Sequence, residues 1–253
     1  MSLETYKSLL DQAGEYLYRI QFYDNGEPFT NRHLLEMVSL AAERNIGSQV
    51  STNFSFAFQE QVYPDIINSG LEHLIVALDG VTPNVYSKYR IGGRFELVES
   101  GLRKIVALKR RLRSRSPFIE WQFIVFDHNR HEIDTAKALA KQIGVDRLCL
   151  KYDAGGHRKQ WRQIDRVRVD AMRHFRLNTC LWLWGALVVD TDGNVSPCCN
   201  AARGESLGDL RQTTLRDIWN SDAIKELRRY VRNEGGSQEV DHQHPCENCP
   251  HIL

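Results

Sequence analysis

No cysteine occurs in the first 148 residues of this 253-residue sequence, and neither sign of charge prevails over the other. Lysine and arginine number 33 against 32 aspartates and glutamates, for a formal net charge of +1. The whole chain therefore has no electrostatic attraction toward nucleic acid or a membrane surface. No apolar run approaches the roughly 18 residues of a membrane-spanning helix, and the start, MSLETYKSLL, lacks the pattern of a secretion signal. Without such a signal, the six cysteines indicate reduced thiols and metal binding, so we expect a cytoplasmic protein.

A basic stretch, LKRRLRSRS at residues 108–116, is the local exception to this balance of charge. A patch that binds nucleic acid is one interpretation. The favoured interpretation is the solvated end of a charged helix, because runs of like charge are usually solvated faces.

Short β-rich runs alternate with helical patterns through the first part of the chain. Strands are expected at residues 16–23, 47–53, 73–80, 118–126 and 145–152, and helices at 31–45, 58–70, 94–112 and 131–144. Repeated strand-then-helix units imply parallel strands with crossover helices, hence an α/β sheet or barrel. The chain opens on a helix at residues 2–14 with Ser2 as its N-cap, half a unit later than such a fold normally begins.

The pattern changes after residue 152, where a polar, arginine-rich stretch reads as a linker. Two β-like runs within residues 179–200 are joined by DTDGN, whose Asp192-Gly193 is a strong hairpin signal. A helical pattern covers residues 207–231, and a polar tail leads to the C-terminus. We therefore expect two domains, residues 1–175 and residues 176–253.

Four cysteines of the second domain are expected to meet. Cys180 precedes the first β-like run and Cys198 ends the second, so the hairpin brings them together. Cys246 and Cys249 form a C-x-x-C in the tail. Four thiolates suit a [4Fe–4S] cluster or a structural zinc ion. Zinc ribbons usually present two C-x-x-C pairs, and a single pair favours iron–sulfur over zinc.

The two remaining cysteines are not expected to be ligands. Cys199 adjoins Cys198, and both cannot easily point at one metal; we favour Cys198 because the second run ends there. Cys149 lies in an apolar strand and is expected to be a small buried hydrophobe.

The ordered pattern C…WGALVVDTDGNVSPCCN…LGDL…LRDIWNS…C-x-x-C resembles the SPASM/Twitch extension of radical S-adenosylmethionine (SAM) enzymes. With four candidate ligands it is similar to the smaller Twitch form, which holds one auxiliary [4Fe–4S] cluster. The first domain resembles the radical SAM partial barrel in four stretches: NGEP (with Asn25 for the first glycine of the family's G-G-E-P), STN, LDG and KYRIGG. The resemblance implies a partial (β/α) barrel followed by a small iron–sulfur domain.

The resemblance also implies a SAM-binding pocket. Its residues would be Gly26, Glu27, Pro28, Asn53, Asp79 and Arg90. Glu27, with its neighbours Gly26 and Pro28, would bind the amino group of SAM, and Arg90 its carboxylate. Taken singly, each of these residues has an ordinary structural explanation as a turn residue or surface charge. Ala77 departs from the family, which often has a small hydroxyl residue before LDG.

The departure with the largest consequence concerns the C-x-x-x-C-x-x-C loop after the family's first strand. Its three thiolates hold the cluster that binds and cleaves SAM, and no cysteine precedes Cys149. We therefore expect a barrel that lacks its first strand, and a chain that by itself does not cleave SAM. One hypothesis is a shortened radical SAM enzyme, acting on a peptide or a small molecule with an electron donor such as a flavodoxin or ferredoxin. The alternatives are a degenerate iron–sulfur scaffold or partner subunit and, less favoured, a zinc-binding adaptor.

Overall fold

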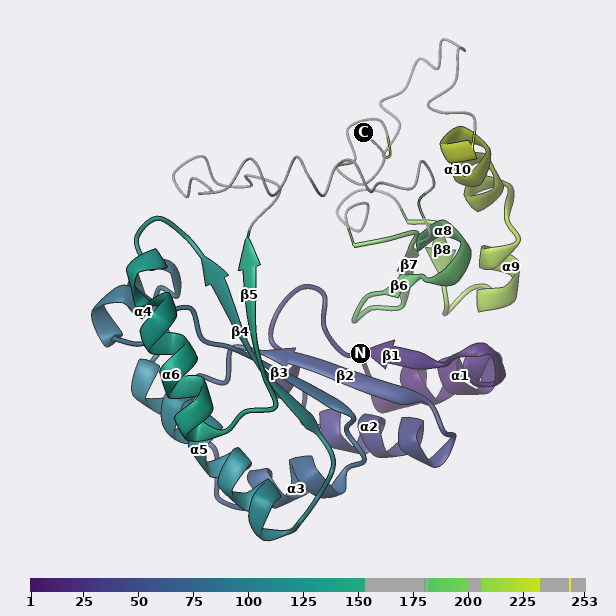
Figure 1. Cartoon of the computed structure of the whole chain (residues 1–253). Helices are drawn as coiled ribbons and strands as arrows, with labels where there is room; N and C mark the ends of the chain where they lie inside the picture. The colour runs from purple at the N-terminus through teal and green to yellow at the C-terminus, as the bar shows by residue number, and fades with distance from the viewer. Residues whose placement is uncertain (153–179, 181, 200–205, 233–245, 247–253) are drawn as a thin grey trace. The chain divides into compact units, whose positions relative to one another are not determined.

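The structure, a computed structural model, describes residues 1–152, 180, 182–199, 206–232 and 246 (Figure 1). The chain divides into two compact units. One comprises Leu17–Arg166, and the other combines Met1–Tyr16 with Val167–Leu253. The predicted domain boundary near residue 175 lies outside the described residues and stays a prediction.

The first unit is built on a parallel five-stranded sheet. Its strands are β1 (Arg19–Gln21), β2 (Gly47–Thr52), β3 (His73–Ala77), β4 (Phe118–Val125) and β5 (Arg147–Tyr152), in the spatial order β1-β2-β3-β4-β5. All five predicted strands are confirmed, although β1 is shorter than expected. Because consecutive strands are neighbours and crossovers are right-handed, the helices must lie on one side of the sheet. Figure 1 shows this arrangement, which is that of a partial barrel.

The helices of this unit are α2 (Leu34–Glu43), α3 (Val62–Asn68), α4 (Pro83–Tyr89), α5 (Phe95–Arg111) and α6 (Ile133–Ile143), with short 3₁₀ turns at Pro28–Thr30 and Arg130–Glu132. Helix α4, of seven residues, was not predicted. The signal it does carry is Pro83 at its first position, where the missing N–H and fixed φ of proline suit a helix start.

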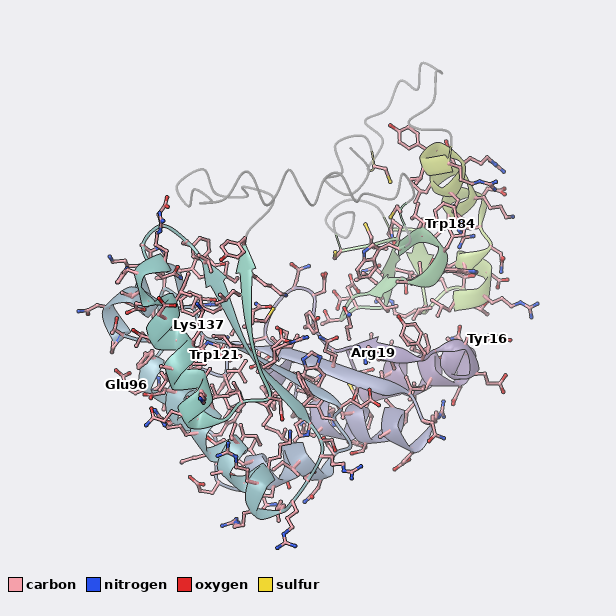
Figure 2. The ribbon with its side chains drawn as sticks, viewed as in Figure 1. Tyr16, Arg19, Glu96, Trp121, Lys137 and Trp184 are labelled. Carbon is pink, nitrogen blue, oxygen red and sulfur yellow. The ribbon has the colours of Figure 1, made fainter. Side chains whose placement is uncertain are left out.

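The helix-facing side of the sheet is apolar. Val76 pairs with Trp121 and Trp121 with Leu148, so these side chains share a face. Trp121, labelled in Figure 2, is fully buried, and its indole N–H donates to the Leu78 carbonyl oxygen at 2.7 Å. Burial of one such large side chain contributes about 2–3 kcal/mol, so this layer holds the sheet and helices together.

The opposite face of the sheet is polar. The register pairs Gln49 with His73 and Glu120 with Arg147, and places Gln122 on the same face. Gln49, Glu120 and Gln122 are only 8%, 2% and 9% exposed. Arg147 donates to the Glu120 carboxylate from Nε at 2.8 Å and also from Nη2, and the His73 ring lies 3.3 Å from the same carboxylate. Polar side chains partnered in this way form the inner face of the partial barrel.

The second unit contains helix α1 (Leu3–Ala13), α8 (Trp182–Gly185), α9 (Leu215–Trp219) and α10 (Asp222–Arg232), with strands β6 (Val188–Val189), β7 (Asn194–Ser196) and β8 (Gly208–Asp209). The Ser2 hydroxyl accepts the Thr5 N–H at 3.1 Å, which confirms the predicted N-cap. The Gln12 side-chain oxygen accepts the Leu215 N–H at 2.8 Å, so α1 supports the start of α9.

The predicted hairpin is confirmed between β6 and β7, which pair antiparallel. The Asp190 carboxylate accepts N–H bonds from Asp192 and Asn194 at 2.8 and 2.9 Å, and Gly193 has a φ of +92° that suits glycine. Desolvation raises the pKa of Asp190, but these hydrogen bonds outweigh it and lower the pKa below its ordinary value. The carboxylate therefore stabilises the turn in its ionised form.

The prediction of a β-like run directly after Cys180 was wrong, because α8 occupies residues 182–185. The Ala186 N–H closes the helical turn on the Trp182 carbonyl at 2.9 Å. The Arg228 Nε–H donates to the Leu183 carbonyl oxygen at 2.8 Å, so a residue distant in sequence stabilises the end of this helix. None of the helices in the described part of the chain is both long and apolar enough to cross a lipid bilayer.

Candidate functional site at the carboxyl ends of the strands

Glu27 is held at the end of β2 by hydrogen bonds from two consecutive residues. The Thr52 hydroxyl donates to its Oε1 atom and the Asn53 N–H to its Oε2 atom, each at 2.7 Å. The Phe29 N–H adds a longer bond of 3.3 Å to Oε1. A carboxylate offers about four acceptor positions, so Glu27, which is only partly buried, keeps capacity for a further donor.

The loop that carries Glu27 is shaped by its two neighbours. Gly26 has a φ of +93°, a conformation that side chains other than glycine rarely adopt, and open space surrounds it. Pro28 occupies the first position of a 3₁₀ turn for which Glu27 is the N-cap. The sequence NGEP therefore reverses the chain after β1 and directs the glutamate toward β2.

A strained residue fixes the loop after β2. Phe54 has a φ of +53° although it is bulky and fully buried. Its N–H donates to the Thr52 hydroxyl oxygen at 2.9 Å, and the Asn53 side-chain oxygen accepts the Ser55 N–H at 2.8 Å. Gly101 of α5 makes room for the ring, since a Cβ there would lie 2.9 Å from Phe54 Cε1. Sequence reasoning missed the roles of Thr52 and Phe54. The strained conformation of Phe54 cannot be predicted from its residue type, because phenylalanine rarely adopts a positive φ.

The second group of predicted residues lies at the ends of β3 and β4. Asp79 is fully buried, and its carboxylate accepts the Arg90 Nε–H at 2.6 Å and the Ile124 N–H at 2.5 Å. Burial raises the pKa of the Asp79 carboxyl, while Arg90 and the Ile124 N–H oppose that rise. Burial lowers the pKa of Arg90, but Asp79 outweighs it and raises the pKa above its ordinary value, so the guanidinium stays charged. The structure shows that Asp79 fixes the position of Arg90; that Asp79 lines the ligand pocket stays a prediction.

Two further residues that sequence reasoning missed stabilise this edge. The Asn129 side chain, fully buried, donates to the Asp79 and Ile124 carbonyl oxygens at 3.0 and 2.8 Å. Glu132 accepts the Val81 N–H at 2.8 Å. Neither residue belongs to a recognisable motif. To predict their roles from the sequence, one would have to know which loops lie next to each other in the fold.

The structure thus brings Glu27 together with Asn53, and Asp79 with Arg90, on adjoining strand ends. The Ser55 hydroxyl accepts the Arg94 N–H at 2.7 Å and links the loop after β2 to the segment that follows Arg90. These residues fit the amino-acid part of SAM, because Glu27 has acceptor capacity for an ammonium group. Among the described residues Arg90 donates from its Nε to Asp79, which leaves its terminal N–H groups for a carboxylate.

Three of the four predicted cluster ligands lie in the described residues. Cys180, Cys198 and Cys246 are each partly exposed, and Cys180 and Cys246 pack against one small apolar cluster around Leu183. Partly exposed thiols beside apolar side chains suit an iron–sulfur cluster. Within the described ranges, however, no three histidine, cysteine, aspartate or glutamate side chains gather closely enough to hold a metal ion. Cys249 lies outside those ranges, so the four-cysteine site stays a prediction.

The other two cysteines differ in their surroundings. Cys199 is exposed. Cys149 is only partly buried, and its register with Gln122 places it on the polar face of the sheet, not in the apolar core as expected. Desolvation and the nearby Glu120 carboxylate raise the pKa of its thiol, which keeps it protonated.

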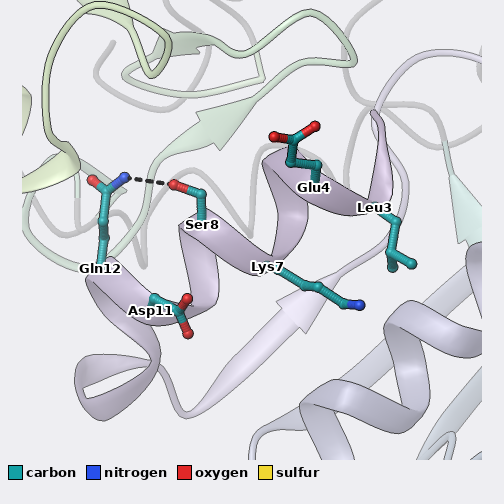
Figure 3. A pocket seen from close by; sticks show the side chains of 6 residues that line it. All are labelled: Leu3, Glu4, Lys7, Ser8, Asp11 and Gln12. Carbon is teal, nitrogen blue, oxygen red and sulfur yellow. Dashed lines mark hydrogen bonds between the residues drawn. The ribbon is translucent and has the colours of Figure 1, made fainter.

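A shallow depression of about 670 Å³ lies along α1 (Figure 3). Its lining residues all come from one helix and include Glu4, Lys7 and Asp11. The Gln12 side-chain N–H donates to the Ser8 hydroxyl at 3.1 Å there. We assign no function to this exposed surface.

The chain is similar to a known domain family and to several known proteins. Residues 180–250 match SPASM, described as an iron–sulfur cluster-binding domain, and the match spans all four predicted ligands. The chain is 26% identical to the PqqA peptide cyclase of Gluconobacter oxydans (strain 621H), over 97% of this chain and 73% of the relative. It is 24% identical to the PqqA peptide cyclase of Xanthomonas euvesicatoria pv. vesicatoria (strain 85-10), over 99% and 72%.

Solved structures share the fold. Streptococcus suis SuiB superposes with a TM-score of 0.67 at 12% identity, over 87% of this chain and 60% of SuiB. Tagged anSMEcpe with bound AdoMet gives a TM-score of 0.64 at 14% identity, over 91% and 75%. The chain therefore spans less than two thirds of the length of SuiB. The C-terminal part of the chain therefore matches the SPASM iron–sulfur cluster-binding domain, and in sequence and fold the whole chain is similar to radical SAM proteins that carry this domain.

Proposed function

We propose that this chain is the SAM-binding and auxiliary-cluster part of a cytoplasmic enzyme that modifies a peptide by radical chemistry. SAM, when cleaved by one electron at an iron–sulfur cluster, supplies a hydrogen-abstracting radical. The residues of this chain would bind and orient SAM and the peptide. Because no cysteine precedes Cys149, the chain by itself is expected to bind SAM without cleaving it.

The observation that carries the proposal is the pairing of Asp79 with Arg90 beside Glu27. The 2.6 Å bond to a fully buried carboxylate fixes the Arg90 guanidinium before any ligand arrives. The bonds from Thr52 and Asn53 fix the Glu27 carboxylate in the same way. One fixed cation and one fixed anion on adjoining strand ends complement the carboxylate and ammonium groups of an amino acid, and ligands of parallel α/β sheets bind at this edge.

A peptide substrate is supported by the polar inner face of the sheet and by the relatives. Gln49 and Gln122 offer amide donors and acceptors there, which suit a peptide backbone. Relatives are called PqqA peptide cyclase, and SuiB has been solved bound to its precursor peptide SuiA. We further propose Cys180, Cys198, Cys246 and Cys249 as ligands of an auxiliary [4Fe–4S] cluster, and a flavodoxin or ferredoxin as electron donor.

The test is the binding of SAM by anaerobically purified protein, measured by isothermal titration calorimetry. Arg90→Lys and Glu27→Gln should each weaken SAM binding about tenfold or more, because each removes a charge-assisted hydrogen bond. Lys137→Ala is the matched control: its side chain lies exposed on α6 and pairs with exposed Asp134. Adenosine, which lacks the amino-acid part, should bind wild type and Arg90→Lys equally. Wild type that binds no SAM, or equal losses for adenosine and SAM, would refute the pocket.

An iron–sulfur scaffold without SAM chemistry is the second candidate, favoured by the absence of cysteine before Cys149. It predicts a bound cluster and no SAM binding. Iron and sulfide analysis should give about four irons per chain for either candidate, and zinc in their place would contradict both.

A further inference from the structure

A hollow of about 450 Å³ lies at the ends of α5 and α6, on the amino-terminal side of β4. Four cations, Lys109, Arg110, Arg113 and Arg115, and one carboxylate, Asp146, line it, and we refer to it as the basic hollow. The proposed SAM site lies at the opposite ends of the strands, so the basic hollow is a separate feature of the same unit.

Ordinary structural roles account for part of this charge. Lys109 binds Asp146 at 2.6 Å, and the Ile119 N–H donates to the same carboxylate oxygen at 2.7 Å, so the one anion is already neutralised. The Arg110 Nη2 lies 3.4 Å from the Gly144 carbonyl oxygen at the end of α6. Cations in the last turn of a helix also offset its dipole. Arg113 and Arg115 lie beyond the helix, and no acidic partner accounts for them among the described ion pairs.

Arg113 occupies a position that normally belongs to glycine. Its φ is +52°, and it sits where α5 ends in a Schellman motif: the Ser114 N–H donates to the Lys109 carbonyl and the Arg113 N–H to the Arg110 carbonyl, both at 3.0 Å. A residue with a Cβ is strained in this conformation, and glycine is not. Arginine at this position therefore lowers stability while it places a cation at the mouth of the hollow.

We propose that the basic hollow binds an acidic stretch of the polypeptide substrate, an inference that rests on the proposed function. Carboxylates are favoured partners for guanidinium groups. Ile119 and Val106 supply an apolar floor for side-chain stems. Nucleic acid is less suitable, because single strands bind through aromatic stacking platforms and no aromatic residue in the described part of the chain lines this hollow.

The length of β4 determines how far the acidic stretch of such a substrate must lie from the residue that is modified. The strand runs from the hollow at Ile119 to Ile124, whose N–H binds Asp79 at the proposed SAM site. The whole strand, Phe118–Val125, spans about 23–27 Å at roughly 3.3 Å per residue. An extended peptide therefore needs about seven or more residues between its acidic stretch and the residue that is modified.

The test uses the whole chain and a fluorescein-labelled peptide of about twelve residues with glutamate at every second position, followed by fluorescence anisotropy at low salt. Arg113→Gly should weaken binding about threefold and raise the midpoint of thermal unfolding, because it removes a cation and relieves the strained conformation. Arg115→Ser should weaken binding similarly, and the double variant about tenfold. Lys137→Ala should leave binding unchanged, and about 0.5 M salt should abolish the difference between wild type and variants.

Equal peptide binding by wild type, Arg113→Gly and Arg115→Ser would overturn the proposal. A single-stranded oligonucleotide of matched charge that binds more tightly than the peptide, and through Arg113, would also overturn it. Arg113-dependent peptide binding in a protein that binds no SAM would support the hollow and refute the proposed function. If SAM binds normally but Arg113→Gly leaves peptide binding unchanged, the proposed role of the basic hollow is refuted and the proposed function is not.

Discussion

Arg90 donates its Nε–H to Asp79 at 2.6 Å, and the Asp79 carboxylate has no exposure to solvent. The two residues are separated by one short helix, α4, whose last residue, Tyr89, precedes the arginine. Burial makes Asp79 depend on its partner, because the Asp79 carboxylate is shielded from water while the Arg90 side chain is 24% exposed.

Asp79→Asn should lower the free energy of unfolding by about 2–4 kcal/mol, because it leaves the Arg90 guanidinium without its counter-charge. Urea denaturation monitored by circular dichroism measures this change. Glu99→Gln is the matched control, since Glu99 pairs with Arg103 one turn away on the surface of α5. It should cost less than about 0.5 kcal/mol. Equal losses for the two variants would show that burial of the Asp79–Arg90 pair has no energetic importance.

Thr52→Val should weaken SAM binding about three- to tenfold, because it removes the hydroxyl that holds Glu27 and accepts the Phe54 N–H. Thr52→Ser keeps the hydroxyl and should restore most of the affinity. Calorimetric titration with SAM distinguishes the two variants. If serine fails to restore binding while the protein remains folded, the hydroxyl is not the reason that Thr52 matters.

Gly101→Ala should destabilise the protein by about 1–2 kcal/mol, although alanine favours helix by about 1 kcal/mol. The added Cβ would meet the Phe54 ring at 2.9 Å. Phe54→Leu in the same chain should recover part of this loss, because leucine is smaller than phenylalanine and leaves room for the added Cβ. Gly185→Ala is the control, because open space surrounds Gly185. Additive effects of Gly101→Ala and Phe54→Leu in urea denaturation would contradict the contact.

Acidification should destabilise the sheet unit through His73. Burial lowers its pKa from the ordinary 6.5, and the nearby Arg147 and Arg19 act in the same direction, while Glu120 opposes them. Below pH 6.5 the unfolded chain then binds more protons than the folded one, so the free energy of unfolding falls as pH falls through this window.

The measurement is urea denaturation at pH 7.5 and 5.5 for wild type and His73→Gln. The glutamine variant should lose less stability on acidification than wild type. Burial also lowers the pKa of His128, so part of the pH dependence should remain. A larger pH dependence in His73→Gln than in wild type would contradict the assignment.

The alternation of periods sufficed to predict the five strands of the sheet and the helices between them, except α4. Local pattern could not distinguish strand from helix at residues 182–185, because the Arg228 contact that favours the helix comes from far along the chain. The ordered motifs indicated Glu27, Asn53, Asp79 and Arg90 together. The role of Asp79 as the buried partner of Arg90 could not be predicted in this way. It depends on the burial of Asp79 against Ile124 and the neighbouring strands. The strained, positive-φ conformation of Arg113 could not be predicted, because glycine is the residue that usually indicates this conformation.

The hydrogen bond between Gln12 and Leu215 joins residues 203 positions apart. The sheet unit, Leu17–Arg166, emerges from the ribosome as one uninterrupted stretch and can close its core early. The first helix must wait for its partner until most of the chain has been synthesised, because loops of such length close slowly. A nascent chain stalled before residue 207 should therefore carry a folded sheet and a first helix that proteases still cut.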